Sequence, residues 1–227
     1  MSEFLVLPQA ASACVLACGA FLKNRAGHVD GTRFAWSALH GDLGEAEACR
    51  ALDASADELL ALGGVGAVAH DLHPDFHSTR LALALAERLG VPAIAVQHHH
   101  AHIAAVIAEA GLDKPVIGLA LDGVGLGSDG TAWGGEVLWV DGGARAHRWE
   151  RVAHLHPLAL PGGDVAAREP WRLAAAVLHS LGRGDEIEAR FGSVVGAPTT
   201  RGLKTMLDRS LNCPTSTGAG RWFDAAA

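Results

Sequence analysis

Short apolar runs that end near glycine alternate with longer segments of helical period along much of this 227-residue chain. The runs at 14–18, 91–96 and 116–121 are predicted to be buried strands, and the segments at 45–62 and 98–110 to be helices. Because strands that alternate with helices form layered sheets covered by those helices, the pattern predicts an α/β fold.

A proline- and glycine-rich stretch at 157–164 interrupts this alternation and marks a predicted boundary. Beyond it, 171–181 and 202–211 have helical period. We therefore expect an α/β lobe over 1–156 and a mainly helical segment over 157–227.

Composition excludes several classes of function. The net charge is -7 with 18 Lys and Arg, and no basic run is present, so nucleic acid is not an expected partner. The longest apolar runs are far shorter than the roughly 20 residues of a membrane-spanning helix. With no signal-peptide pattern at the start, a cytoplasmic location is predicted. The four cysteines lack C-x-x-C spacing and are predicted to be structural.

The densest chemical signal is the histidine cluster at 96–102 (VQHHHAH), where a strand ends and a helix begins. His98 and His102 are four residues apart, so they share one helical face and can direct ring nitrogens at one ion. A metal ion needs further donors, and Asp122 follows the next strand at the edge where ligands collect in α/β sheets. The alternative is a helix start with solvated histidines.

A second histidine group, His70, His73 and His77, is less suited to ligation. If Pro74 opens the helix, His73 lies outside it and shares no face with His77. We expect a structural role here, with His73 or Asp71 as the cap. Two charged residues nearby stay open between surface and site roles: Asp75 and Arg80.

Glycines alternate in the segment 122–130 (DGVGLGSDG), which lets backbone N–H groups approach an anion. No Gly-Lys-Ser/Thr follows and no helix is predicted after it, so the segment is neither a P-loop nor a dinucleotide fingerprint. A plain hairpin turn is the alternative. After the first strand, Lys23 and Asn24 could face a phosphate or carbonyl oxygen, although a lysine in such a turn is often only solvated.

A series of specific motifs covers nearly the whole chain in order. They are HDLHPDF at 70–76 with STR at 78–80, VQHHHAH at 96–102, LALDGVGLGSDG at 119–130 with WGGE at 133–136, LPGGD at 160–164, REPWR at 168–172, CP at 213–214 and GRWFD at 220–224. Together they resemble the carbamoyltransferase domain of HypF-type [NiFe]-hydrogenase maturation proteins.

This resemblance implies a fold of the actin, hexokinase and Hsp70 kind, with the first lobe and a mainly helical part present and the second lobe incomplete. It also implies a reaction in two stages. Carbamoyl phosphate and ATP form carbamoyl adenylate in a separate domain, and the actin-like domain passes the carbamoyl group to the C-terminal cysteine of HypE for cyanide-ligand synthesis.

By the same resemblance, His98, His102 and Asp122 bind a divalent metal, zinc or iron. Lys23 and Asn24 are the implied catalytic residues and face the ligand. The glycines implied to bind the nucleotide-derived cofactor are Gly123, Gly125, Gly127, Gly134 and Gly135. The chain departs from the family pattern where Val124 and Leu126 replace a small polar residue and a tyrosine, and where His77 replaces an apolar or aromatic residue.

Two other functions remain open from the sequence. The chain could be a non-catalytic metal- or nucleotide-binding module, which an incomplete second lobe favours. It could also transfer carbamoyl to a different acceptor, such as a tRNA adenosine or a small-molecule hydroxyl. The acidic charge counts against tRNA.

Overall fold

A computed structural model describes residues 3–227 of the chain and divides into two compact units. The first contains the residues up to Gly118 together with Leu138–Glu150, and the second contains Leu119–Val137 and Arg151–Ala227. The sequence suggested a single division near residue 157. The units differ from that scheme because two long strands, β7 (Val116–Leu126) and β8 (Ala132–Val140), each contribute residues to both.

The first unit is built on a six-stranded mixed sheet. Its strands are β1 (Glu3–Val6), β2 (Val15–Ala17), β3 (Gly27–Asp30), β4 (Arg33–Trp36), β5 (Ala67–Asp71) and β6 (Ala93–Val96), in the order β1-β4-β3-β2-β5-β6. The pairs β2–β5 and β5–β6 are parallel, and the other pairs are antiparallel. The predicted strands at 14–18 and 91–96 are therefore confirmed.

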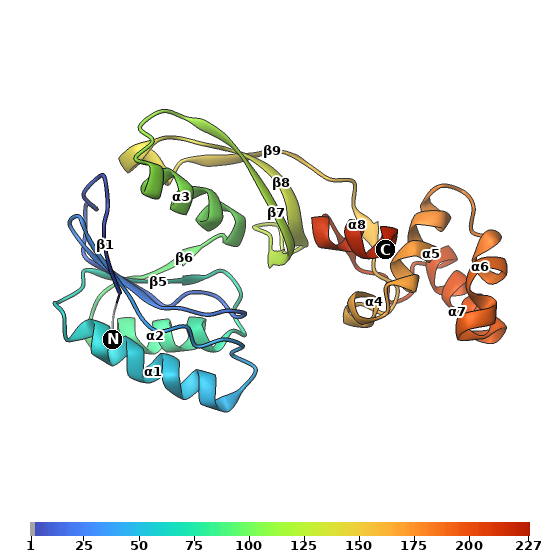
Figure 1. Cartoon of the computed structure of the whole chain (residues 1–227), viewed down its shortest axis with the longest axis horizontal. Helices are drawn as coiled ribbons and strands as arrows, with labels where there is room; N and C mark the ends of the chain where they lie inside the picture. Colours follow the sequence, from blue (N-terminus) through green and yellow to red (C-terminus); the bar gives the residue numbers. More distant parts are fainter. Residues whose placement is uncertain (1–2) are drawn as a thin grey trace. The chain divides into compact units, whose positions relative to one another are not determined.

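Helices α1 (Ala46–Leu60) and α2 (His77–Leu89) lie on one side of this sheet, and α3 (His98–Ala110) lies on the other (Figure 1). The apolar faces of α1 and α2 meet the strands in a core that includes Leu16, Leu52 and Val68. α2 and α3 each end at a glycine in the left-handed region, with φ of 67° at residue 90 and 63° at residue 111. Only glycine adopts this conformation without steric cost, which explains why both helices stop there.

The predicted start of α2 at Pro74 is wrong. The helix begins at His77, because the preceding residues form a turn in which the Asp71 carboxylate accepts the backbone N–H of His73 at 2.9 Å. The N-cap position belongs to Phe76, whose side chain makes no cap hydrogen bond, so neither His73 nor Asp71 caps the helix.

The second histidine group makes local contacts within the first unit. The His73 ring stacks on Phe76 with centroids 4.3 Å apart, and His77 Nε2 lies 2.8 Å from Asp53 Oδ1. These contacts fit the structural role that we expected for His73 and His77.

A second sheet has five strands: β7 (Val116–Leu126), β8 (Ala132–Val140), β9 (Trp149–His154), β10 (Leu158–Ala159) and β11 (Thr215–Ser216). The order is β10-β11-β8-β7, with β9 also paired to β8. β7 continues five residues beyond its predicted end at 121, so Gly123 and Gly125 lie in the strand and the turn is confined to the residues that follow Leu126.

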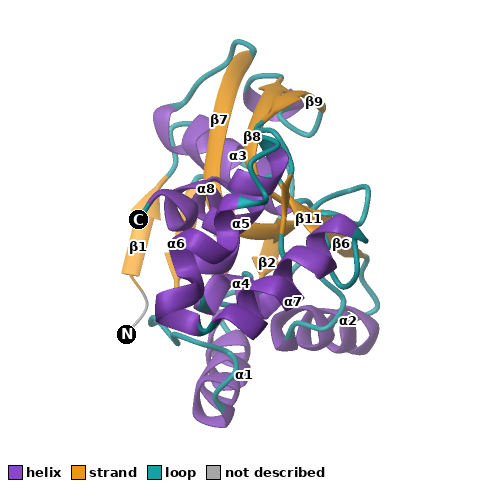
Figure 2. Cartoon of the chain, turned by 90° about the vertical axis from the view of Figure 1, so that its right-hand side faces the viewer, coloured by secondary structure: helices purple, strands orange, loops and turns teal. Residues whose placement is uncertain are grey.

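The rest of the second unit is mainly helical, as predicted (Figure 2). The helices α5 (Trp171–Ser180), α6 (Glu186–Val195) and α7 (Ala197–Asp208) pack together around a core that includes Leu173. α6 was not predicted, and α7 begins before residue 202 because Gly196 separates the two helices with a φ of 90°. Two short helices complete the unit: α4 (Asp164–Arg168) and α8 (Ala219–Ala226).

All four cysteines carry free thiols. Cys18 directly follows β2 and is fully buried, and this burial raises the pKa of its thiol to about 12. A thiol held protonated in this way is a poor nucleophile, which agrees with a structural role.

Within residues 3–227, no helix combines the length and apolarity needed to cross a membrane.

The core of the first unit provides a matched test. Leu52 on α1 is 0% exposed and Leu83 on α2 is 49% exposed. Leu52→Ala leaves a cavity in close-packed surroundings and is expected to lower the free energy of unfolding by about 2–5 kcal/mol. Leu83→Ala is expected to change it by less than about 1 kcal/mol. Urea unfolding of both variants checks this, and equal losses would contradict the assigned core.

Candidate metal and ligand site

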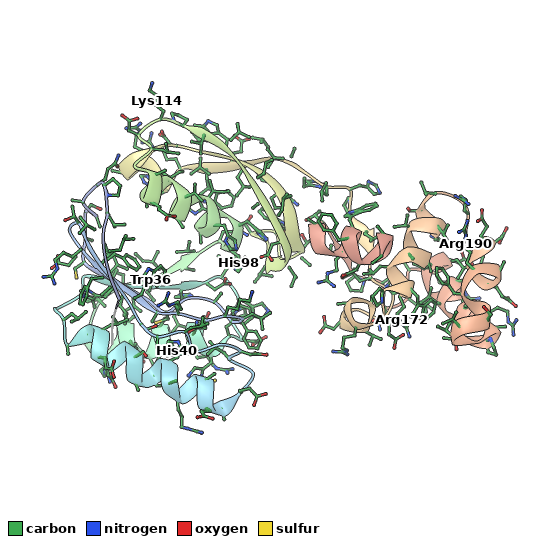
Figure 3. All side chains as sticks on the ribbon, viewed as in Figure 1. Trp36, His40, His98, Lys114, Arg172 and Arg190 are labelled. Carbon is green, nitrogen blue, oxygen red and sulfur yellow. The ribbon has the colours of Figure 1, made fainter. Side chains whose placement is uncertain are left out.

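Two parallel strands bring an acid and a histidine together at one edge of the first sheet. Asp71 is the last residue of β5 and pairs in register with Val96, the last residue of β6. α3 begins two residues later at His98. His98, which Figure 3 labels at the start of α3, donates from Nδ1 to Asp71 Oδ2 at 2.7 Å. Because carboxyl ends of parallel strands share an edge, this contact follows directly from the topology.

The Asp71 carboxylate stays ionised at neutral pH. Burial raises its pKa, but hydrogen bonds from His98 and from the backbone N–H of His73 outweigh that effect, so the pKa lies below its usual value. The carboxylate can only accept, so it fixes the proton of His98 on Nδ1 and leaves Nε2 as the ligating nitrogen.

His98 and His102 lie on one face of α3, as their spacing predicted. Their Nε2 atoms are 3.3 Å apart. Two nitrogens bound to one tetrahedral ion at about 2.0–2.1 Å would be about 3.3 Å apart, so the pair fits a shared metal ion. A carboxylate behind one histidine is also the usual outer partner of a metal-bound imidazole.

The other two histidines of the cluster point elsewhere. His99 is fully buried, and its Nδ1 lies 3.1 Å from Gln97 Nε2. His100 Nε2 donates to the Ala146 carbonyl at 2.7 Å, and its ring stacks on Trp149. Gln97 caps α3 by accepting the backbone N–H of His100 at 2.8 Å. The cluster therefore contributes two residues to the candidate site and two to packing.

A cavity of about 530 Å³ opens beside this pair, and all of its lining residues belong to the first unit. One part of its wall is polar and includes Lys23, His70 and Asp71 with the two candidate ligands. The other part is apolar and includes Phe34 and Trp36. A cavity of this size and composition is typical of a small-molecule site.

Asn24 lines the cavity, but its side chain is buried and bonded to the protein at both ends. Nδ2 donates to the carbonyls of Cys18 at 2.9 Å and Ala20 at 3.0 Å. Oδ1 must therefore accept, and it does so from His40 Nδ1 at 2.8 Å. These contacts stabilise the turn that carries Lys23. Asn24 therefore shapes the cavity wall by fixing this turn.

His40 is kept neutral by its surroundings. Burial and then the positive charge of Arg25 lower its pKa. With the proton on Nδ1, Nε2 accepts from the Ser55 hydroxyl at 2.9 Å. Lys23, the residue before Asn24, is exposed. Its φ of 49° is a conformation that is uncommon outside glycine.

In the second unit, Asp122 and the predicted glycines lie close to other backbone segments. Asp122 Oδ1 accepts the N–H of Gly123 at 2.6 Å. A Cβ on Gly134 would lie 2.8 Å from the Asp122 carbonyl oxygen, and one on Gly135 would overlap the Thr217 carbonyl. Glycine is required at these positions by close approach to the chain itself. Gly127 likewise leaves no room for a Cβ beside the Trp133 indole.

Glu136, in β8, is the fully buried acid of this region. Its Oε1 accepts the N–H groups of Gly134 at 2.9 Å and Gly135 at 3.2 Å and the hydroxyl of Thr217, while Oε2 accepts Arg151 Nε at 2.6 Å. Burial raises the pKa of Glu136, but these donors outweigh it and hold the pKa below its usual value.

Two family models match the chain one after the other. The model described as HypF Kae1-like domain covers residues 10–109, and the model described as Carbamoyltransferase, Kae1-like Domain, second subdomain covers residues 118–227. The chain belongs to the HypF family. The predicted resemblance is confirmed, and so is the α/β fold.

Relatives and a solved structure agree with the HypF assignment. A carbamoyltransferase HypF homolog from Cupriavidus necator is 64% identical over 94% of this chain and 54% of its own length. Carbamoyltransferase HypF2 from the same organism is 57% identical over 94% of the chain and 26% of its length. The crystal structure of full-length HypF in the phosphate- and nucleotide-bound form superposes with a TM-score of 0.83 at 33% identity, over 98% of this chain and 28% of that one. The chain thus spans about half or less of these HypF proteins.

Two residues of the site were missed from the sequence. Asp71 was considered only as a helix cap, although the parallel strands that end at Asp71 and Val96 gave a signal for its contact with His98. Glu136 gave no such signal, because its partner Thr217 is 81 residues away in the chain.

The buried acid generates a pH-dependent prediction. Folding lowers the pKa of Glu136 from about 4.5, its value in the unfolded chain. The ionised side chain therefore stabilises the fold fully above pH 4.5, and this contribution is lost as the pH falls toward the lower pKa of the folded state. Glu136→Gln is expected to lower the free energy of unfolding by about 3–5 kcal/mol at pH 7, as for a broken buried ion pair. The difference in free energy of unfolding between the variant and the wild type should become smaller below pH 4.5. Urea unfolding between pH 7 and pH 3.5 measures it. A gap that stays constant or widens in acid would contradict the prediction.

Proposed function

We propose that this chain carries the carbamoyl-transfer step of a HypF-type protein. The carbamoyl group would pass from carbamoyl adenylate, derived from ATP and carbamoyl phosphate in the whole protein, to the C-terminal cysteine of a HypE-type partner. The observation that carries the proposal is the His98–His102 pair, oriented by Asp71 beside a cavity, in a chain 64% identical to a carbamoyltransferase HypF homolog.

The proposed metal ligands are His98, His102 and Asp122. The period of β7 supports the third ligand. Gly118 packs against Ile103 of α3 so closely that a Cβ would lie 2.5 Å from Ile103 Cδ1. Alternate residues of a strand share a face, so Asp122 stands on the same face of β7 as Gly118, about 13 Å along. Two imidazoles and one carboxylate suit zinc or iron(II).

The transfer itself needs few groups from the protein. The acceptor thiolate attacks the carbamoyl carbon, the new C–S bond forms, and the C–O bond to the phosphate breaks, with AMP leaving with the bonding electron pair. A divalent ion at the proposed site would act as a Lewis acid that stabilises negative charge on the carbamoyl or phosphate oxygen.

The chain's own residues have positioning and charge roles in this proposal. Asp71 orients His98, and Lys23 places a cation at the cavity wall where a phosphate can be neutralised. Asn24 keeps the Lys23 turn in place through its contacts to backbone carbonyls. The glycines of β7 and β8 that we expected to contact the nucleotide-derived ligand are packed against the chain's own segments, so in this proposal they act on a phosphate through the position of those segments.

Metal content tests the ligand set directly. Purified wild-type chain is expected to hold near-stoichiometric zinc or iron by elemental analysis. His98→Ala, His102→Ala and Asp122→Ala should each lose most of it, because each removes a donor from a three-residue site. His147→Ala is the control, since this histidine is exposed and its only hydrogen bond among the described residues is to the Ala144 carbonyl. Equal metal in all variants, or metal in none, would refute the site.

Group transfer is tested with the acceptor itself. Carbamoyl adenylate and a HypE-type protein are incubated with the chain, and the mass of the acceptor's C-terminal peptide is followed. A gain of one carbamoyl group that requires the wild-type chain, and that falls at least about a hundredfold in His98→Ala, is expected. Metal binding without any transfer would favour the non-catalytic module.

A further inference from the structure

Glu136 connects three segments that are distant in the sequence. It belongs to β8, it accepts two backbone N–H groups from its own strand, and it binds Arg151 of β9 and Thr217 after β11. Each carboxylate oxygen is satisfied by a charged or polar donor, and the side chain is fully removed from solvent. A buried acid with this many donors is rigid, because losing any one of them is costly.

The segments that Glu136 joins enclose the backbone of Asp122. A Cβ on Gly134 would lie 2.8 Å from the Asp122 carbonyl oxygen and 2.9 Å from Gly218 Cα. A Cβ on Gly218 would overlap the carbonyl of Gly123, and one on Gly220 would lie 3.0 Å from Gly123 Cα. Three glycines therefore close around residues 122 and 123, one from β8 and two from the segment next to Thr217.

We infer that Glu136 is a positioning residue for Asp122. By holding the N–H groups of Gly134 and Gly135 and the hydroxyl of Thr217, it presses both segments onto the Asp122 backbone and sets the direction of that carboxylate. This inference rests on the proposed metal site. Its consequence is that metal affinity depends on Glu136, which is not itself a ligand.

The same network contains a matched control. Arg151 also reaches Asp129 Oδ2 at 3.5 Å, and its guanidinium lies 3.9 Å from the centre of the Trp133 ring. Asp129 accepts from Trp133 Nε1 at 3.0 Å and from Thr131, so it supports the turn after β7. It makes none of the Glu136 contacts to Gly134 or Thr217 among those described. Asp129→Asn therefore disturbs the network without releasing the Asp122 backbone.

The test measures zinc affinity by competition with a chromophoric chelator, alongside thermal unfolding of the metal-free chain. Glu136→Gln is expected to weaken zinc binding about ten- to a hundredfold. Thr217→Val, which removes one hydroxyl and keeps the shape, should weaken it about tenfold and secures the test if the first variant does not fold. Asp129→Asn should leave affinity within about twofold while lowering the unfolding temperature. Asp122→Asn is measured in parallel.

Each outcome has one meaning. Loss of affinity in the Glu136, Thr217 and Asp122 variants with affinity retained in Asp129→Asn supports positioning. Affinity retained in Glu136→Gln and Thr217→Val but lost in Asp122→Asn overturns positioning and leaves the proposed ligands intact. If zinc affinity is retained in Asp122→Asn, Asp122 is not a metal ligand, and both the proposed ligand set and the positioning role of Glu136 are overturned. A loss in Asp129→Asn equal to that in Thr217→Val means general destabilisation and also overturns positioning.

Discussion

The hydrogen bond between Asp71 and His98 joins the sheet to α3 in the first unit, and the candidate site depends on it. A carboxylate removed from water is costly unless donors replace the lost hydration. Here the donors are the His98 ring and the backbone N–H of His73. The contact that stabilises the buried charge also fixes which nitrogen of His98 faces His102. Stability and site geometry therefore have the same physical origin.

In each unit a buried acid organises the surroundings of the candidate site residues. In the first unit Asp71 links strand ends to a helix start, and in the second Glu136 links β8, β9 and the segment after β11. Both have pKa values held below the usual range because hydrogen bonds outweigh burial. Neither is a proposed metal ligand, and the reason is chemical: the oxygens of both side chains already accept N–H or O–H groups of the protein. Their part in the proposed chemistry is to orient other residues.

Sequence reasoning recovered what depends on local pattern. The bounds of α3 were predicted to the residue, because its helical period, its strand-end start and its terminal glycine agree. The start of α2 was misplaced, because a proline can open a helix or occupy a turn, and the Asp71 contact to His73 selected the turn. β7 was predicted too short, since its glycines look like a turn when the pairing with β8 is unknown. The role of Glu136 depends on Thr217 and could not be found from spacing.

The glycines near Asp122 illustrate why a motif suggests more than one function. A glycine at such a position reports that something approaches the backbone, but it does not report what approaches. Alternating glycines after a strand were compatible with an anion site or a plain hairpin turn, and the family resemblance implied that they bind the nucleotide-derived cofactor. In the structure, Gly134 lies against Asp122 and Gly218 against Gly123, so the close approaches are made by the chain to itself. A larger residue at Gly134 would then act first on the Asp122 backbone, and any effect on a bound phosphate would follow from that displacement. In this proposal the glycine motif and the metal site depend on each other, because backbone packing at the glycines determines where the Asp122 carboxylate points.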